Sequence, residues 1–107
     1  MTNRTLTGLC LALVVLLSAC ALEIDLKQQS RFEAFDDGRF RYESYADAAW
    51  PESSERAESA RIKVLEETLA TNRLCTDGFE LSERKAFLKQ KGFAGDVYDL
   101  VYYGRCT

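Results

Sequence analysis

An apolar run close to the amino terminus limits what the rest of the chain can fold into. Residues 9 to 17 carry no charged side chain, Arg4 precedes them, and the first acidic residue is Glu23. A short apolar run behind a positive residue is typical of a secretory signal, which is removed from the mature protein. The charge-free stretch is close to the length of a membrane span, but threonine, glycine and serine dilute it. We therefore expect the folded domain to follow this run.

The end of the run matches a more specific pattern. Leu17-Ser18-Ala19-Cys20 resembles the lipobox of bacterial lipoproteins, in which the Cys becomes the first mature residue and carries acyl chains. The resemblance implies a signal at 1–19 that is removed, a lipid anchor at Cys20 and a place in the bacterial cell envelope. Ala21 after the Cys resembles an outer-membrane address, which would place the domain on the periplasmic side of that membrane. The alternative is an ordinary secretory signal and a soluble protein that begins at Cys20.

Residues 20–107 have the size of one small domain. Loss of Arg4 with the signal leaves 14 − 1 = 13 basic residues against 17 acidic ones, a formal charge of −4. A mildly acidic chain without a block of Lys or Arg argues against nucleic-acid binding and against adhesion to anionic membranes beyond the anchor. The expected membrane contact is the lipid itself.

Alternating residues predict strands in the first part of the mature chain. Leu22, Ile24 and Leu26 alternate with charged residues, which favours a half-buried strand near the anchor. Arg31–Phe35 and Arg39–Tyr45 flank Asp36-Asp37-Gly38, and an Asp-Gly pair suits a tight turn. The pattern predicts a hairpin with Phe40 and Tyr42 on one face.

A helix is predicted after Trp50-Pro51, because proline suits a first helical turn and Ser53 or Ser54 can cap it. It should end near Asn72, a residue that tolerates left-handed angles. Apolar residues gather on one side of the helical wheel: Ala57, Ala60, Ile62, Val64, Leu65 and Leu69. We expect this side to pack on a sheet, rather than in a partner's groove or on a membrane, because the polar side carries charges of both signs.

Two further strands are predicted after the helix. Asp77-Gly78 leads into a strand over 79–84, and the stretch 96–105 is the most β-prone of the chain and reads as a central strand. The order of elements predicts an α+β fold. We expect a small antiparallel sheet of about four strands with one amphipathic helix packed on one face, and strands before and after the helix.

Cys75 and Cys106 are expected to form a structural disulfide, since exported chains of this size commonly carry one. A metal or redox pair is the alternative. The chain has no histidine as a further ligand, and the two residues are far from the Cys-x-x-Cys spacing of redox catalysts. The carboxy-terminal half, which ends in Tyr103-Gly104-Arg105-Cys106, looks like many small bacterial lipoproteins, and this resemblance implies no activity.

The absence of histidine from the sequence excludes catalysis that needs an imidazole base. Glu66-Glu67 and the pair Asp96/Asp99 could act as acid and base, but both are expected to be ordinary surface charges. Asp36-Asp37-Gly38 lacks the spaced acids of a calcium loop, and no phosphate-binding glycine loop is present. We expect no enzyme activity, no metal and no cofactor.

The closing strand carries tyrosines on both faces. Tyr98 and Tyr102 should lie on one side and Tyr103 on the other, and a single helix covers only one side. We expect the uncovered face to bind another envelope protein or a second copy, because tyrosine is enriched at interfaces. The competing interpretation is that aromatic residues of the amino-terminal hairpin cover it: Phe32, Phe35 and Phe40.

The sequence thus predicts a non-enzymatic, lipid-anchored envelope protein, an accessory or interaction module. The alternative is a small-ligand binder or a carboxylate-based enzyme of the periplasm, which would need a concave pocket with convergent acids.

Overall fold

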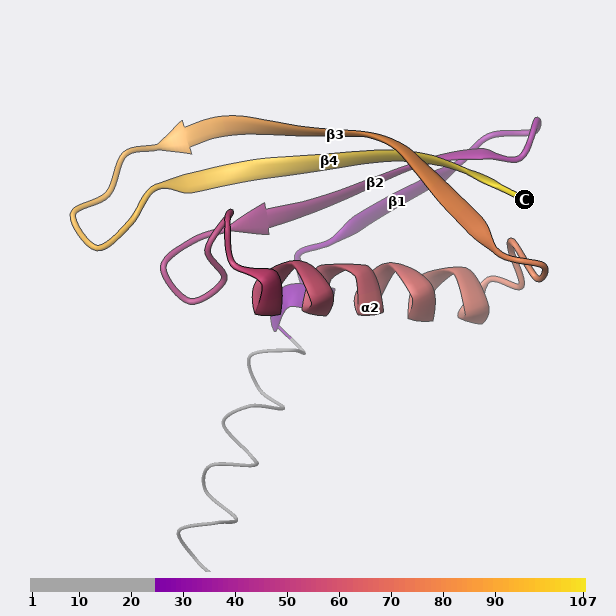
Figure 1. Ribbon diagram of the computed structural model, residues 1–107, viewed down its shortest axis with the longest axis horizontal. Coiled ribbons are helices and arrows are strands. Elements are labelled where there is room, and N and C mark those ends of the chain that lie inside the picture. The colour runs from indigo at the N-terminus through magenta and orange to yellow at the C-terminus, as the bar shows by residue number, and fades with distance from the viewer. Residues whose placement is uncertain (1–24) are drawn as a thin grey trace, which may run out of the picture.

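The computed structural model describes residues 25–107, which form a four-stranded antiparallel sheet with one long helix against one face (Figure 1). The elements follow the order β1 (Arg31–Ala34), β2 (Arg39–Ala46), α2 (Glu55–Thr71), β3 (Phe79–Gln90) and β4 (Val97–Cys106). In the sheet the strand order is β1-β2-β4-β3. The predicted α+β fold is confirmed, and β4 lies inside the sheet as expected.

The predicted hairpin is β1–β2. Gly38 takes a φ of 84°, which an Asp-Gly turn requires, and the Asp37 carboxylate accepts hydrogen bonds from the backbone and the guanidinium of Arg39. Phe40 and Tyr42 are buried on one face, as predicted.

The strand predicted over residues 22–26 is wrong where the structure describes it. Residues 25–28 form a helical turn, in which Gln29 N–H donates to the Asp25 carbonyl. Ser30 Oγ then donates to the Leu26 carbonyl. Leu26, the member of the apolar alternation that the structure describes, is fully buried, and one inward residue fits a helical turn as well as a strand. Leu22 and Ile24 lie outside the described residues.

The helix begins at Glu55, after the Ser54 hydroxyl caps it by accepting from the Ala57 N–H. Pro51 therefore precedes the helix instead of forming its first turn. The helix ends at Thr71, close to the predicted Asn72. The left-handed residue is Arg73, with a φ of 56°, and not Asn72, whose φ is −91°.

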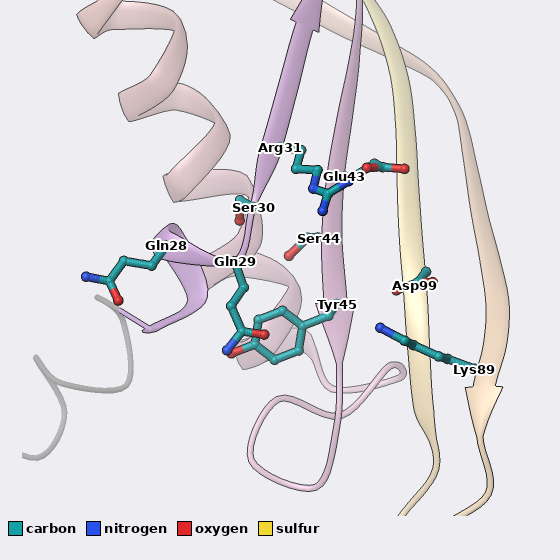
Figure 2. A pocket seen from close by; sticks show the side chains of 9 residues that line it. All are labelled: Gln28, Gln29, Ser30, Arg31, Glu43, Ser44, Tyr45, Lys89 and Asp99. Atoms are coloured by element: carbon teal, nitrogen blue, oxygen red, sulfur yellow. The ribbon is translucent and has the colours of Figure 1, made fainter.

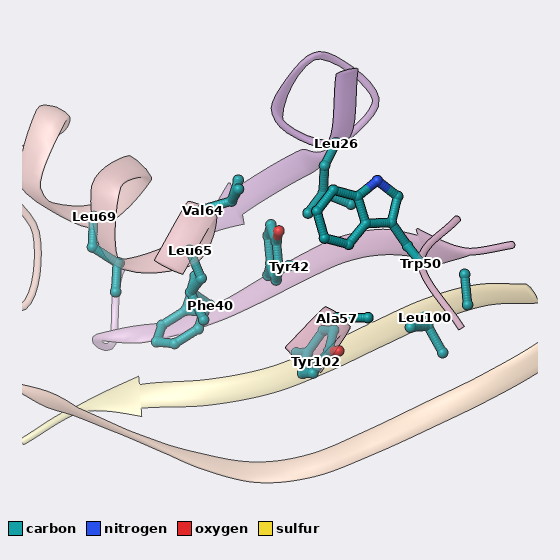
Figure 3. Packing of buried hydrophobic residues seen from close by; sticks show 11 residues of the cluster. Leu26, Phe40, Tyr42, Trp50, Ala57, Val64, Leu65, Leu69, Leu100 and Tyr102 are labelled. Carbon is teal, nitrogen blue, oxygen red and sulfur yellow. The ribbon is translucent and has the colours of Figure 1, made fainter. Parts of the chain in front are cut away.

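The core lies between α2 and the sheet (Figure 3). Buried side chains from every layer meet there: Leu26, Phe40, Tyr42, Trp50, Leu65, Leu69, Leu100 and Tyr102. Phe40 lies so close to β4 that a methyl group at Gly104 would come within 2.5 Å of its ring. Glycine at position 104 of β4 leaves the space that the Phe40 ring of β2 occupies.

The sheet has two unlike ends (Figure 1). The disulfide end comprises the β1–β2 turn, residues 35–38, and the bond between Cys75 and Cys106. The hairpin end comprises the β2–α2 connection, residues 47–54, and the β3–β4 loop, residues 91–96. The antiparallel register, with Phe40 opposite Gly104 and Ala46 opposite Tyr98, puts these loops at opposite ends.

Candidate functional site

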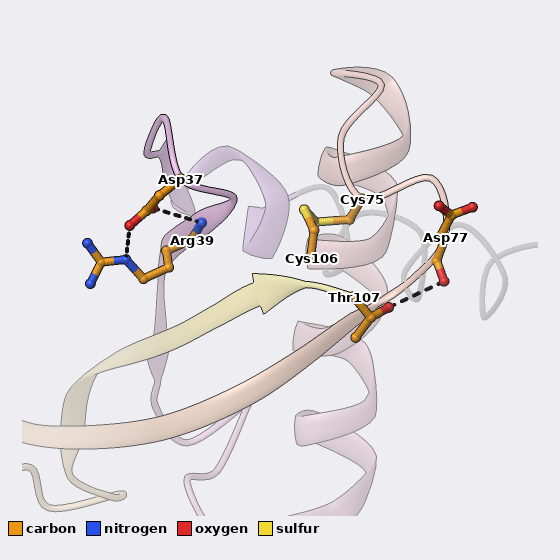
Figure 4. Close-up of a disulfide and its surroundings, with 6 residues drawn as sticks. All are labelled: Asp37, Arg39, Cys75, Asp77, Cys106 and Thr107. Carbon is orange, nitrogen blue, oxygen red and sulfur yellow. Dashed lines mark hydrogen bonds and ion pairs between the residues drawn. A yellow bond between two sulfur atoms is a disulfide. The ribbon is translucent and has the colours of Figure 1, made fainter.

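Cys75 and Cys106 form the predicted disulfide, with their Cα atoms 4.7 Å apart (Figure 4). The bond joins the segment after α2 to the last residue of β4. The same region is tied by hydrogen bonds from Cys106 N–H to the Gly38 carbonyl and from Thr107 N–H to the Gly78 carbonyl. Cys75 packs against the core, so the pair acts as a structural link.

The three tyrosines predicted to form a partner surface do not share one. Tyr102 is fully buried beneath α2, where its ring lies 5.5 Å from that of Tyr42. Tyr98 is half-buried on the same side, opposite Ala46 in the register. The sequence pattern separated the two faces of β4 correctly, but it did not tell which of them the helix covers. The placement of Tyr102 on an accessible surface is therefore wrong.

Tyr103 points to the other face of the sheet, which no described element covers. Arg41 hydrogen-bonds to Glu43 at 2.6 Å and lies opposite Tyr103 in the register. Lys85 lies over the Tyr103 ring, with Nζ 5.7 Å from the centroid. Hydrogen bonds to Tyr103 and Glu43 raise the pKa of Arg41. This part of the outer face is thus a charged surface around the half-buried Tyr103.

Aromatic residues of the β1–β2 hairpin do not cover the outer face. Phe32 and Phe40 stack at 5.6 Å on the α2 side, and Phe35 is exposed in the turn. The competing interpretation of the sequence is therefore wrong.

A polar network lies under the first turns of α2 and comprises Glu52, Glu58, Arg61, Arg84 and Tyr102. Arg61 is fully buried and donates to Glu58 at 3.1 Å and to the carbonyls of Tyr45, Trp50 and Pro51. Glu58 also accepts from the Tyr102 hydroxyl at 2.8 Å and from Arg84 at 3.2 Å. The network joins α2, the sheet and the β2–α2 connection.

The pKa values of Tyr102 and Arg84 are both raised in the polar network, which keeps the hydroxyl protonated and the guanidinium charged. Burial raises the pKa of Tyr102 to about 12, with Arg84 opposing the rise and Glu58 adding to it. The pKa of Arg84 is raised by hydrogen bonds to Glu52 and Tyr102 against the effect of burial. Every charge in the network has an opposite partner, so the network fits a structural role.

A shallow hollow of about 420 Å³ lies where β1 begins (Figure 2). Its lining comes from residues 28–31 and three strands, with polar and charged side chains: Gln28, Gln29, Ser30, Arg31, Glu43, Ser44, Tyr45, Lys89 and Asp99. Ser44 is 5% exposed, and its hydroxyl has no hydrogen-bond partner among the described residues. Burial and the neighbouring Asp25 raise the pKa of Tyr45, whose hydroxyl donates to that carboxylate. The hollow suits a small polar group.

Apolar side chains are exposed along the hairpin end. Phe87 and Leu88 are 53% and 51% exposed, and Phe93 in the β3–β4 loop is fully exposed. The sequence pattern predicted a strand only over 79–84 and so missed residues 85–90, which form the second half of β3. Bulges near Ser82 and Lys89 interrupt the period-2 alternation on which strand prediction depends.

The acidic residues that the sequence offered as acid and base make local contacts in the structure. Glu67 pairs with Lys27 at 3.8 Å, and Asp96 accepts from the Gly92 N–H at 3.4 Å, so the acidic pairs serve local contacts. Within residues 25–107, no three acidic or cysteine side chains gather as a metal site would need. No helix in the same part of the chain is long and apolar enough to cross a membrane. Cys20 lies outside the described residues.

Comparison with known proteins gives no relative. No protein-family model, no curated protein and no solved structure matches the chain.

Sequence reasoning missed Arg61, the centre of the polar network. The available signal was its position: Arg61 lies one helical turn from Ala57 and from Leu65, on the apolar side of the helix. A charged side chain on the apolar side of a helix either turns toward solvent or pairs with another polar group. Glu58, three residues earlier in the helix, is such a partner for Arg61.

Proposed function

We propose that the chain is a lipid-tethered, non-enzymatic protein of the bacterial cell envelope, acting as an accessory or interaction module. The proposal is carried by the lipobox-like sequence that ends at Cys20, six residues before the core residue Leu26. A chain of that length would hold the domain within roughly 20 Å of the acylated residue. The Cys75–Cys106 disulfide supports export, because such bonds persist in oxidising compartments.

The outer face of the sheet is the surface on which we propose that a protein partner binds. It presents Arg41, Glu43, Lys85 and Tyr103 without any described element over it. Alternating charges around an aromatic ring fit the polar rim and aromatic centre of protein interfaces, and they favour another envelope protein over a lipid or a nucleic acid.

The alternative is a small-ligand binder that uses the hollow near β1. The unpartnered Ser44 hydroxyl favours it. The carboxylate of Glu43, however, is bonded to Arg41, so the hollow holds no pair of convergent free acids for catalysis. We therefore favour the interaction module.

The anchor is tested by labelling with palmitate in cells. We expect Cys20→Ala to abolish the label and leave uncleaved precursor, because the thiol is the site of acylation. Cys75→Ala is the matched control, since it removes a cysteine of the folded domain, and its label should be retained. Label that still enters Cys20→Ala would refute the anchor.

A further inference from the structure

The β3–β4 hairpin ends in a segment with apolar side chains on both of its faces. Phe87 lies opposite Asp99 on the outer face, Leu88 lies opposite Tyr98 on the helix face, and Phe93 is at the tip. The hairpin reaches beyond the start of α2 (Figure 1), so the helix does not cover these residues. A segment with apolar side chains on both faces is better suited to insertion into a lipid surface, which contacts both faces, than to docking against one flat protein surface.

The charge of this tip differs from that of the whole chain. Residues 87–96 contain Lys89, Lys91 and one acid, Asp96, which gives 2 − 1 = +1, whereas the mature chain carries −4. Neither lysine forms an ion pair with another residue of the described range. Phenylalanine and leucine beside free lysines are typical of segments that lie at an anionic lipid surface.

The point where the chain enters the fold lies near the same end. The Tyr45 hydroxyl, next to the end of β2, donates to the Asp25 carboxylate at 2.9 Å. A methyl group at Gly95 would come within 3.5 Å of Ala48, so the β3–β4 loop packs on the β2–α2 connection. Asp25 lies five positions after Cys20 in the chain, a reach of about 17 Å when fully extended. An anchor at Cys20 therefore keeps the hairpin end close to the membrane.

We propose that the tip of the β3–β4 hairpin, with Phe87, Leu88, Lys89, Lys91 and Phe93, inserts into the surface of the anionic membrane that holds the lipid anchor. This inference rests on the proposed anchor at Cys20 and adds a second contact to it. The tip fixes the orientation of the domain: it turns the disulfide end away from the bilayer and leaves the outer face of the sheet accessible to a partner. Membrane adhesion beyond the anchor, which the overall charge argues against, then comes from a local excess of lysine.

The test uses the acylated full-length product in vesicles of phosphatidylethanolamine and phosphatidylglycerol with brominated acyl chains, which quench tryptophan on contact. Phe93→Trp places the probe at the tip. Phe35→Trp is the matched control, because Phe35 is 42% exposed in the turn at the disulfide end. The native Trp50 is 5% exposed and gives the background. We expect strong quenching in Phe93→Trp and only background quenching in Phe35→Trp.

A second variant tests the charge. Lys89→Glu combined with Lys91→Glu, in the Phe93→Trp protein, should lower the ratio of inserted to free tips roughly tenfold or more in anionic vesicles, because each lysine is attracted to the anionic surface. In vesicles of phosphatidylcholine the two proteins should be quenched alike. These residues are exposed, so the fold should be unaffected. The same two substitutions in the chain that keeps Phe93 check this, because the emission of its one tryptophan, Trp50, should be unchanged.

The outcomes separate the inference from the proposed function. Mass spectrometry of each sample measures acylation at Cys20. Acylated Phe93→Trp without quenching, or with quenching equal to that of Phe35→Trp, overturns the insertion of the tip and leaves the anchor intact. A product without acyl chains overturns the anchor, and with it the inference.

Discussion

The two ends of the sheet are closed in different ways. At the disulfide end, a covalent bond and short backbone hydrogen bonds hold the β1–β2 turn, the segment after α2 and the last residues of β4 together. At the hairpin end, the polar network holds α2 to β2 and the β2–α2 connection through Arg61, and the β3–β4 hairpin projects beyond it. The disulfide end therefore has a covalent link in addition to its hydrogen bonds, whereas the hairpin end is held by hydrogen bonds and ion pairs.

The difference follows from what each end has to bury. Phe40, Phe79 and Leu69 fill the core at the disulfide end with apolar side chains. At the hairpin end the carbonyls of Tyr45 and Trp50 are turned inward and need donors, which the guanidinium supplies. The arrangement crosslinks the disulfide end and leaves the side chains of the hairpin tip exposed for outside contacts.

Removal of the disulfide should have the largest effect. The bond closes a loop of about 32 residues, for which the chain-entropy relation gives ~3.7 kcal/mol of stabilisation. We expect Cys106→Ser, or reductant on the wild type, to lower the free energy of unfolding by about this amount. Urea unfolding followed by Trp50 fluorescence measures it. Phe93→Ser at the opposite end is the control and should leave stability within about 0.5 kcal/mol.

Two results would contradict the disulfide prediction. Mass mapping under non-reducing conditions could find two free thiols, or reductant could leave the unfolding midpoint unchanged. Either would mean that the disulfide end is held by its hydrogen bonds alone.

Local signals in the sequence were enough for the disulfide end. The Asp37-Gly38 turn and the Cys75–Cys106 pair depend on neighbouring residues or on a single pairing, so composition and spacing predict them. The Ser54 cap at the hairpin end is a local signal of the same kind. The hairpin end required tertiary information. The length of β3 was hidden by its bulges. Tyr102 looked accessible because strand alternation does not say which face receives the helix.

Arg61→Met should have the next largest effect. The methionine keeps much of the apolar stem, but it leaves inward-facing carbonyls without their donor and removes one of the three donors to Glu58, so we expect a loss of about 3 kcal/mol in the free energy of unfolding. The same urea titration measures it. Arg56→Met is the matched control, because Arg56 is exposed on the same helix and should change stability little. Equal effects of the two variants would show that the buried guanidinium does not hold the hairpin end.

The smallest effect should appear at high pH, and it should belong to the polar network. The pKa of Tyr102 is raised to about 12 by burial, against an ordinary value of about 10 in the unfolded chain. Below pH 10 both states keep the proton and the contribution is constant. Between pH 10 and 12 the unfolded state releases its proton first, so the free energy of unfolding falls, by about 1.4 kcal/mol at pH 11.

Tyr102→Phe removes this contribution, and the variant should lose that much less stability between pH 9 and 11 than the wild type. Tyr103→Phe is the matched control, because this tyrosine lies on the outer face beside Lys85 and outside the polar network. If Tyr102→Phe and Tyr103→Phe give the same pH dependence, alkaline destabilisation does not act through the hydroxyl that Glu58 accepts from.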